Sequence, residues 1–425
     1  MKLTPYWLDT APRFAGATHG PVEGAYDVAV IGGGFCGLSA ARRLAQGGAS
    51  VVLLEAGEVG AAASGRNGGH LNNGVAHSWA AAKAALGERR ARALYHAFDA
   101  SIETIETIAR EEGIDCAFRR CGKLKLASKP AHFESIAKNF EALHREIDPD
   151  TQLLSRAELK GEIGSDAFHG GLLMKKSAMM HMGRFGAGLA TAAMRRGARI
   201  YENAAVTGLR VENGRHVATT ARGQVSAREV LIATGATTTA NFGWFRRRIV
   251  PVGSFIVATR PLTDAEIAAT MPGDRTYVTS LNIGNYFRLS PDRRLLWGGR
   301  ARFTPVSNAQ SDEKSGAILR ASLAETFPQL KDVEIDYCWG GLVDMTQDRF
   351  PRAGRHEGAW YALGFSGHGA QLAPHMGMVM ADAILGRANA NPLDGLDWPA
   401  VPGHFGRAWF LPLVGMYYKA LDRWR

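Results

Sequence analysis

The sequence predicts an α/β protein, in the broad sense that includes α+β, with a Rossmann-like domain and a second domain built on an antiparallel sheet. Two observations predict the first domain: "DVAVIGGGFCGLSAARRL" (27–44) has the pattern of a strand, a glycine-rich turn and a helix, and "SVVLLE" (50–55) has that of the next strand. A third predicts the second domain, because residues 249–335 contain many extended, β-branched and aromatic stretches.

The glycine-rich turn has the spacing of a dinucleotide site. Gly32, Gly34 and Gly37 form G-x-G-x-x-G, which allows a tight turn, close approach of a pyrophosphate, and close helix–strand packing. The helix that follows directs free N–H groups and a partial positive charge at the phosphates. Glu55 ends the next strand, where it can accept a hydrogen bond from a ribose hydroxyl. The alternative is a βαβ turn with a purely structural role.

The segment after Glu55 favours FAD over NAD. "AGEVGAAASGRNGGHLNNG" (56–74) is small, polar and glycine-rich, without a run typical of a strand. Such a loop can lay backbone N–H groups along a long, bent cofactor, although a flexible surface loop would have the same composition. The residues that we expect at the cofactor here are Ala56, Ser64, Arg66, Asn67, Gly68, Gly69 and His70.

Three later segments return to the cofactor. "NAAVTGL" (203–209) and "IATGA" (232–236) end or begin predicted strands, and "GFSGHG" (364–369) joins a strand to a helix. A helix N-terminus at the last segment would stabilise the negative charge that two-electron reduction leaves on a flavin. We expect the backbone of Gly364, Gly367, His368 and Gly369 to lie there. His368 has either a direct catalytic role or a structural one.

Composition limits the class of protein. The 425 residues are 46% hydrophobic and 21% charged, as in ordinary globular proteins. The net charge is +10, but the arginines are scattered and no nucleic-acid motif is present, so we expect no nucleic-acid partner. Four cysteines form no C-x-x-C pair and no metal motif, so we expect reduced thiols and no metal. Without a secretory signal or a membrane-spanning run, we expect a cytoplasmic protein, either free or at the inner face of the membrane.

The quoted segments occur in an order that resembles the D-amino-acid oxidase/sarcosine oxidase superfamily of FAD-dependent enzymes. "ASGRNGGHL", "WGG" before "TQDRFPRAG", and "GFSGHG" are most similar to its gamma-glutamylputrescine oxidase-like branch. The resemblance implies oxidation of a C–N bond by hydride transfer to flavin N5, giving an imine that hydrolyses. Oxygen or a quinone then reoxidises the flavin. It also implies cofactor contacts at Val206, Thr234 and Gly235.

Three departures from the superfamily matter. Val343 stands where its glycine and D-amino-acid oxidases have a carboxylate-binding arginine, which favours an amine or a carboxylate bound elsewhere. No lysine lies between Lys176 and Lys314, where sarcosine oxidases have one that promotes the reaction with oxygen. Cys338 is displaced from the position that binds flavin covalently, so we expect noncovalent FAD.

The organisation follows from these segments. An arm at 1–23 leads into a discontinuous FAD-binding domain (24–90, 170–245 and 336–390), a substrate domain (91–169 and 246–335) and a C-terminal tail (391–425). The sheet of the substrate domain would cover the flavin. Its candidate substrate contacts, with core packing as the alternative for each, are Ser254, Tyr286, Arg288, Trp297 and Arg300.

Three classes of function stay open at this point. The leading one is oxidation of a small amine or amino acid, with a gamma-glutamylputrescine-like amine favoured and oxygen as acceptor. Another is a pipecolate- or proline-type dehydrogenase that passes electrons to a quinone, which the aromatic, apolar and basic tail "FGRAWFLPLVGMYYKALDRWR" (405–425) would suit by contacting a membrane. The remaining one is a flavin-binding subunit of a hetero-oligomeric dehydrogenase. No second nucleotide-binding unit supports an NAD(P)H-dependent flavoenzyme.

Overall fold

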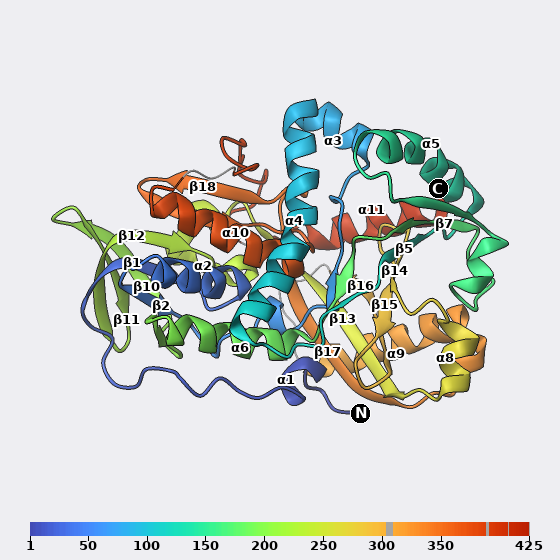
Figure 1. The fold of residues 1–425 in the computed structure, drawn as a ribbon, viewed down its shortest axis with the longest axis horizontal. Helices are drawn as coiled ribbons and strands as arrows, with labels where there is room; N and C mark the ends of the chain where they lie inside the picture. The colour runs from blue at the N-terminus through green and yellow to red at the C-terminus, as the bar shows by residue number, and fades with distance from the viewer. Residues whose placement is uncertain (303–308, 388–390, 407, 425) are drawn as a thin grey trace.

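The computed structural model describes residues 1–302, 309–387, 391–406 and 408–424, without the side chains of 300–302 and 309–311. Figure 1 shows two lobes side by side, one formed largely by the blue and light-green segments and the other by the yellow, gold and teal ones. The described residues form a large sheet in each lobe and a small third sheet. The α/β class with an antiparallel second sheet is therefore confirmed.

The first sheet is built around β1 (Ala25–Ile31), which pairs in parallel with β2 (Val51–Leu54) and β12 (Gly223–Ile232). Four of the seven residues of β1 are buried in an unbroken run at its end, which is typical of a parallel strand covered on both faces. The other strands are β9 (Arg199–Tyr201) beside β2, β11 (Arg215–Thr220) and then β10 (Val206–Glu212) beside β12, and the hairpin of β18 (Arg352–His356) and β19 (Ala359–Leu363).

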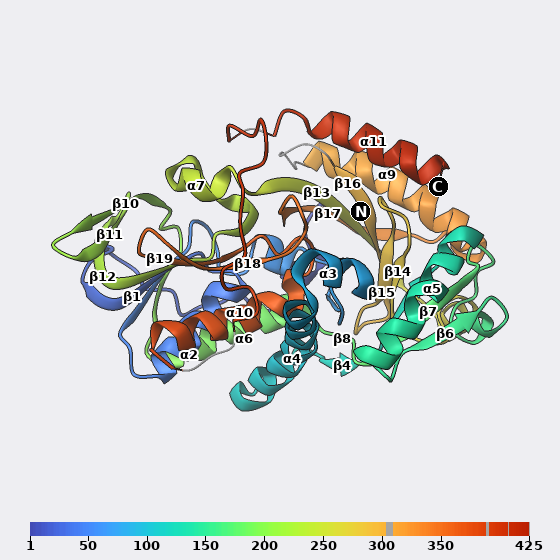
Figure 2. The same ribbon diagram turned by 90° about the horizontal axis from the view of Figure 1, so that it is seen from above.

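Three helices of this lobe pack closely because glycines and small residues lie at their contacts. They are α2 (Phe35–Gln46), α6 (Met182–Arg195) and α10 (Gly369–Ile384), with the long α4 (Glu88–Glu112) across them (Figures 1 and 2). A Cβ atom on Gly377 of α10 would collide with the Cys36 carbonyl of α2. The buried Arg42 guanidinium donates to Glu112 over 2.6 Å, which joins α2 to α4.

The second sheet is mostly antiparallel and carries a large aromatic core on one face. Phe287 stacks on Trp297 and Tyr277 there, beneath α8 (Asp264–Thr270) and α9 (Ala309–Thr326). The strand order is β17 (Ile335–Met345), β13 (Val250–Pro261), β16 (Arg294–Arg302), β15 (Tyr286–Leu289), β14 (Thr276–Thr279), β5 (Lys123–Leu126), β7 (Gly170–Met174) and β6 (Gln152–Ser155).

The remaining elements connect the two large sheets or lie at their edges. Among them is the small third sheet. Its strands are β3 (His70–Leu71), β8 (Ala178–Met179) and β4 (Arg119–Arg120). The helices are α1 (Tyr6–Asp9), α3 (Trp79–Leu86), α5 (Pro130–Glu146), α7 (Gly243–Arg246) and α11 (Leu411–Trp424), and the short 3₁₀ turns are η1 (Ala63–Gly65), η2 (Glu158–Gly161), η3 (Gly235–Thr237), η4 (Ala240–Phe242) and η5 (Pro328–Leu330).

The strand pairing places two segments differently from the predicted domain boundaries. The sequence assigned the segments that form β7 and β17 to the nucleotide-binding domain, but both strands pair in the second sheet. Hydrogen bonding decides this, because β17 pairs with β13 along almost its whole length. The second sheet therefore reaches directly to the loop that follows β17.

The N-terminal arm is part of the core, although the sequence predicts it as a separate leading segment. Trp7 is fully buried, and its Nε1 donates to the Asn67 carbonyl over 2.6 Å. Tyr6 packs edge-on against Trp7 and Tyr337. The arm thus supports the loop at 63–72 from below.

Candidate active site

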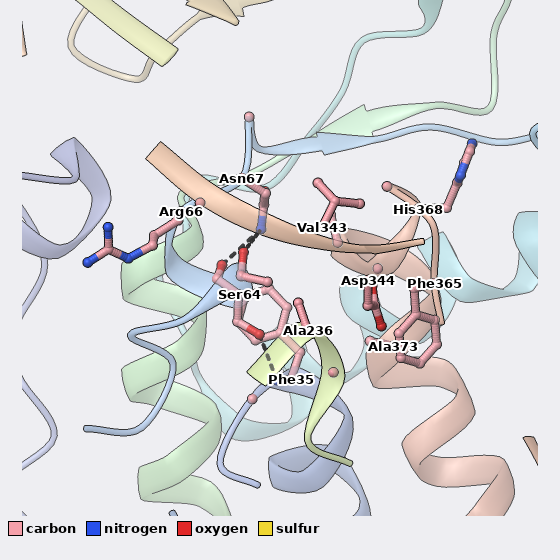
Figure 3. A pocket seen from close by; sticks show the side chains of 18 of the residues that line it. Phe35, Ser64, Arg66, Asn67, Ala236, Val343, Asp344, Phe365, His368 and Ala373 are labelled. Carbon is pink, nitrogen blue, oxygen red and sulfur yellow. Dashed lines mark hydrogen bonds between the residues drawn. The ribbon is translucent and has the colours of Figure 1, made fainter. Parts of the chain in front are cut away.

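A cavity of about 330 Å³ lies where the two lobes meet (Figure 3). Its walls come from the start of α2, the loop at 63–72, the segment after β12, the start of α10, and the second sheet through β13, β14, β15 and β17. The cavity therefore joins the glycine-rich turn predicted for the dinucleotide to the sheet predicted for the substrate.

The start of α2 presents its backbone to the cavity. Gly34 is the N-cap residue and has no side chain to cap the first turn, while Phe35 N–H donates to the Ser64 hydroxyl over 3.0 Å. Gly34, Phe35 and Cys36 all line the cavity. Free N–H groups and the helix dipole at this end suit a phosphate.

The turn itself has room for glycine alone at three places. Gly32 has φ +110°, and a Cβ there would lie 2.6 Å from the Ala233 carbonyl. A Cβ on Gly33 would lie 2.9 Å from the Glu55 side chain, and one on Gly37 would collide with the Gly32 carbonyl. Gly32 therefore makes the tight turn that the sequence predicts, and Gly37 allows the close packing of helix and strand. The conformation of the turn is compatible with a pyrophosphate at Gly34.

The acidic residue after β2 lies beside the same turn. The Glu55 carboxylate accepts from Gly33 N–H over 2.6 Å and from Gly57 N–H over 2.8 Å. The Glu55 carbonyl accepts from Ala204 N–H, which brings the segment leading to Val206 alongside. Gly235 lines the cavity, whereas eight of the predicted cofactor contacts lie outside the cavity lining, and these are Gly32, Gly37, Glu55, Ala56, Gly69, Val206, Thr234 and Gly364.

The loop at 63–72 holds itself in shape and lies against the cavity. Asn67 anchors it, since its side chain donates to the Ser64 carbonyl over 2.9 Å and accepts from Gly69 N–H over 2.8 Å. Arg66 donates to the Gly340 carbonyl over 2.9 Å, which ties the loop to β17. The predicted residues that line the cavity here are Ser64, Arg66, Asn67, Gly68 and His70, whereas Gly69 does not.

His70 is a neutral ring held between two carbonyl groups. Its Nδ1 lies 3.0 Å from the Gly68 carbonyl and its Nε2 lies 3.2 Å from the Phe287 carbonyl. Burial and the nearby charge of Arg288 lower the pKa of His70 to about 3. The neutral ring has a single N–H, so it donates to one of these two carbonyls, and its other nitrogen faces the second without a hydrogen bond.

The start of α10 faces the cavity from the opposite side. His368 is its N-cap residue and makes no side-chain cap, and Gly367, Gly369, Ala370 and Gln371 line the cavity with it. Burial and the charge of Lys123 lower the pKa of His368 to about 4, so the ring is neutral. A negative charge in the cavity would be stabilised by this helix end, as the sequence predicts.

Asp344 is a cavity residue that the sequence analysis missed. Its side chain accepts from Gly364 N–H over 2.8 Å, and burial raises its pKa to about 6. Figure 3 shows it on β17 beside Phe365, below Val343. The available signal was an acidic residue inside the apolar run "WGGLVDM". Two further lining residues without a predicted role are Asn72 and Gln371, which are joined by a 2.7 Å hydrogen bond from the Gln371 amide to the Asn72 carbonyl.

Two of the predicted substrate contacts face the cavity together. The hydroxyls of Ser254 on β13 and Tyr286 on β15 lie 3.1 Å apart, and both residues line the cavity. Burial raises the pKa of Tyr286 to about 12, so it is a neutral hydroxyl that can donate or accept. Val343 also lines the cavity, at the position where the sequence predicts a missing arginine.

The other substrate candidates do not join them. Arg288 lies beneath the loop, where it donates to the carbonyls of Gly68 (3.0 Å) and Met180 (2.7 Å) and does not line the cavity. Trp297 points to the opposite face of the sheet and donates to the Ser322 hydroxyl over 2.9 Å. The expected placement of both residues was wrong. The loop covers Arg288, and the alternation of side chains along the strand places Trp297 on the opposite face of the sheet. The side chain of Arg300 lies outside the described residues.

The sequence matches the family model described as FAD dependent oxidoreductase (DAO) over residues 27–383. It is 34% identical to the probable oxidoreductase OrdL of Haemophilus influenzae, over 94% of this chain and 92% of that protein. It is 32% identical to the gamma-glutamylputrescine oxidoreductase of Escherichia coli, over 93% of each chain.

The fold is similar to solved structures of the same kind. The crystal structure of glycine oxidase from Geobacillus kaustophilus superposes with a TM-score of 0.73 at 26% identity, covering 89% of this chain and all of that one. The L-proline dehydrogenase of P. horikoshii superposes with a TM-score of 0.71 at 20% identity, over 87% of this chain and 96% of that one, which is a likeness of fold.

Proposed function

The chain belongs to the family of FAD-dependent oxidoreductases, and we propose that within this family it oxidises the C–N bond of a small amine related to gamma-glutamylputrescine. It is an FAD-dependent enzyme that acts on amines or amino acids. One observation carries the narrower proposal: two helix starts, those of α2 and α10, open onto one cavity whose remaining wall is the second sheet with Ser254 and Tyr286.

The cofactor contacts follow from the cavity. Bound FAD supplies the two-electron acceptor for oxidation of the amine to an imine, which water then hydrolyses. The start of α2 would hold the pyrophosphate, Glu55 a ribose hydroxyl, and the start of α10 the end of the flavin that becomes negative. Cys338 donates to the Asp312 carbonyl over 2.8 Å, away from the cavity lining, which supports noncovalent FAD.

The apolar wall at Val343 favours an amine as the substrate. A simple amino acid would need a carboxylate-binding arginine at this position, as in the glycine oxidases. No guanidinium projects into the cavity from this part of β17. Ser254 and Tyr286 would lie over the reacting end of the substrate, where their hydroxyls can accept a hydrogen bond from the amine.

Anaerobic reduction tests the proposal. We expect gamma-glutamylputrescine to bleach the flavin absorbance of the purified holoenzyme in the absence of oxygen, and we expect sarcosine, proline and D-amino acids to do so more slowly. Admitting air should restore the absorbance and yield hydrogen peroxide, because oxygen is the proposed acceptor. No bleaching by any amine would contradict the proposed substrate class.

The C-terminal helix favours a second candidate, a dehydrogenase that works at a membrane surface. α11 exposes Leu413 (57%), Met416 (60%) and Tyr417 (61%) along one side, with Trp409 (67%) just before it. Figure 2 shows α11 at the outer edge of the second lobe. No helix in the described part of the chain is long and apolar enough to cross a bilayer. An apolar, aromatic stripe on a protein of net charge +10 suits the surface of an anionic membrane.

Vesicle binding and acceptor choice distinguish this candidate. Reduced flavin that stays bleached in air but recovers with a soluble quinone, together with sedimentation on anionic phospholipid vesicles, would support it. Replacing Met416 and Tyr417 with serine should then release the protein from vesicles. The matched control is Val211→Ser, which removes an equally exposed (61%) apolar side chain from the other lobe.

A further inference from the structure

We infer that the buried carboxyl group of Asp344 is a cofactor contact, and that it holds a hydroxyl group of the ribityl chain of FAD. This chain is the part of the cofactor between the pyrophosphate and the flavin ring. The inference rests on FAD binding and is independent of which amine the enzyme oxidises. It gives β17, a strand of the second sheet, a direct part in holding the cofactor.

The carboxyl ends of neighbouring parallel strands give the course of the cofactor. β2, β1, β12 and β19 lie side by side in this order, each parallel to the next. They lead to Glu55, Gly32, Ala233 and Gly364 respectively. Ligands of such sheets lie outside these strand ends. With a ribose at Glu55 and the pyrophosphate at the start of α2, the chain that continues toward the flavin crosses the ends of β12 and β19.

The Asp344 carboxyl group lies at the ends of β12 and β19, although the residue belongs to the second sheet. Its Oδ2 atom accepts from Gly364 N–H, directly after β19, over 2.8 Å. The same atom lies 3.8 Å from the position that a Cβ on Gly235, in the segment after β12, would occupy. Ser366 N–H donates to the Asp344 carbonyl over 3.1 Å, which holds the end of β17 against the segment after β19. The carboxyl group is therefore on the expected course of the ribityl chain.

The alternation of side chains along β17 turns Asp344 away from the candidate substrate contacts. Ser254 of β13 pairs with Gly341 of β17, so Gly341 and Val343 lie on the face that carries Ser254. Asp344 follows Val343 and points to the other side of the strand, beside Phe365 (Figure 3). Both Val343 and Asp344 line the cavity. This position favours contact with the cofactor over contact with the amine.

The carboxyl group is in a state that suits a hydroxyl donor. Asp344 is only 7% exposed, and none of the described residues forms an ion pair with it. Burial raises its pKa to about 6, even though backbone N–H groups after β19 stabilise the anion. At pH 8 it is therefore an anion with acceptor sites left over. A hydroxyl group supplies a donor there, whereas a phosphate would bring a second negative charge.

FAD analogues test the inference without any amine. Each analogue has one ribityl hydroxyl group replaced by hydrogen, and its dissociation from the full-length protein at pH 8 is followed through flavin fluorescence. We expect the parent to bind one of the analogues about tenfold more weakly than FAD. Asp344→Ala should bind FAD about tenfold more weakly than the parent does, and it should bind that analogue and FAD equally well.

Two further variants control for a loss of stability. Glu162→Ala removes an acid that accepts from Arg275 over 2.6 Å, outside the cavity lining, and it should keep the tenfold preference for FAD. Asp344→Asn replaces the anion with a neutral partner, so the preference should fall to about threefold, and this comparison carries the test if Asp344→Ala does not fold. An unchanged preference in the Asp344 variants, or no preference in the parent, would overturn the inference.

Amine oxidation separates this inference from the proposed reaction. If no amine bleaches the flavin but the preference for FAD falls in the Asp344 variants, the proposed reaction fails and the cofactor contact stands. If amines are oxidised and the preference is the same in all variants, the cofactor contact fails. With FAD saturating, we expect Asp344→Asn to leave KM for the amine unchanged. A raised KM with an unchanged preference for FAD would make Asp344 a substrate contact and overturn the inference.

Discussion

Arg288 gives the clearest case of a residue whose surroundings decide its role. It lies on the same face of β15 as Tyr286, as the sequence suggested, but the loop at 63–72 covers it. Its guanidinium also lies over the Trp7 ring, 5.0 Å from the centroid, so it joins the N-terminal arm, the loop and the segment before α6. Burial lowers its pKa only to about 10, which keeps it charged at neutral pH.

Replacing Arg288 should therefore loosen the cofactor loop and leave substrate recognition intact. Arg288→Met leaves the Met180 carbonyl without its side-chain donor, at a cost of about 1–3 kcal/mol, and leaves His70 Nδ1, at 3.0 Å, as the side-chain partner of the Gly68 carbonyl. We expect a lower melting temperature and weaker FAD binding, with an unchanged amine KM once FAD is saturating. Arg89→Met, at an exposed position of α4, is the control. If the variant had a raised KM for the amine and normal stability, Arg288 would instead be a substrate contact.

Asp344 provides a second prediction at this scale. Its raised pKa fixes the direction in which protein stability changes with pH. With a pKa of about 6 in the folded protein and 3.8 as its ordinary value, the folded state binds the proton more tightly. This contribution to stability is present at pH 4 and is lost as pH rises through 6. Asp344→Asn keeps an acceptor for Gly364 N–H without the charge. The variant should gain up to about 3 kcal/mol relative to the parent between pH 4 and 7, measured by urea unfolding. A difference that does not change with pH would contradict the assignment.

At the scale of elements, the strand–turn–helix units were predictable and the contacts between distant units were not. The glycine spacing and Glu55 identify the start of α2, because local backbone geometry demands them. "GFSGHG" identifies the start of α10 in the same way. By contrast, the parallel pairing of β5 with β14 joins segments about 150 residues apart, so no local pattern predicts it.

In the second sheet, the sequence does not predict which face of a strand each side chain occupies. Trp297 and Tyr286 both occur in strands of the expected sheet, yet they lie on opposite faces. A shift of one residue in register reverses the face of every side chain, and the aromatic content of these strands suits either face. The contribution of Trp7 was also hidden, because its partner at Asn67 is 60 residues away.

The turn before α2 yields a prediction that belongs to the element. Gly37→Ala places a methyl group against the Gly32 carbonyl and 3.1 Å from Val30, so helix and strand must separate. We expect loss of FAD from the purified protein and a lower melting temperature. Gly243→Ala at the start of α7, where nothing lies within 4 Å of the new methyl group, should have little effect. Normal FAD content in the Gly37 variant would contradict this prediction, because it would show that FAD binds even when helix and strand are further apart.

At the scale of the whole molecule, neutral histidines join parts that are distant in sequence. His70 links the cofactor loop to β15, and His181 links α6 to Thr10 of the arm, with 3.0 Å between Nε2 and the hydroxyl. His375 of α10 lies 2.8 Å from the Thr104 hydroxyl of α4. His70 lines the cavity together with His368 at the start of α10, whereas His181 and His375 lie at contacts between other elements. Burial is the main reason that their pKa values fall to about 3 or 4.

These histidines predict that the molecule loses stability in mild acid. Their folded pKa values lie below the ordinary 6.5, so the unfolded chain takes up protons first, and stability falls as pH drops from about 6.5 toward 4. Each contributes a slope of about 1.4 kcal/mol per pH unit in the middle of this range, opposite in sign to the effect of Asp344. His375→Asn should flatten the pH dependence of urea unfolding by about that amount, while the exposed His19→Asn should not change it. If the difference between the His375 variant and the parent were the same at pH 7 and pH 5, acid sensitivity would have another origin.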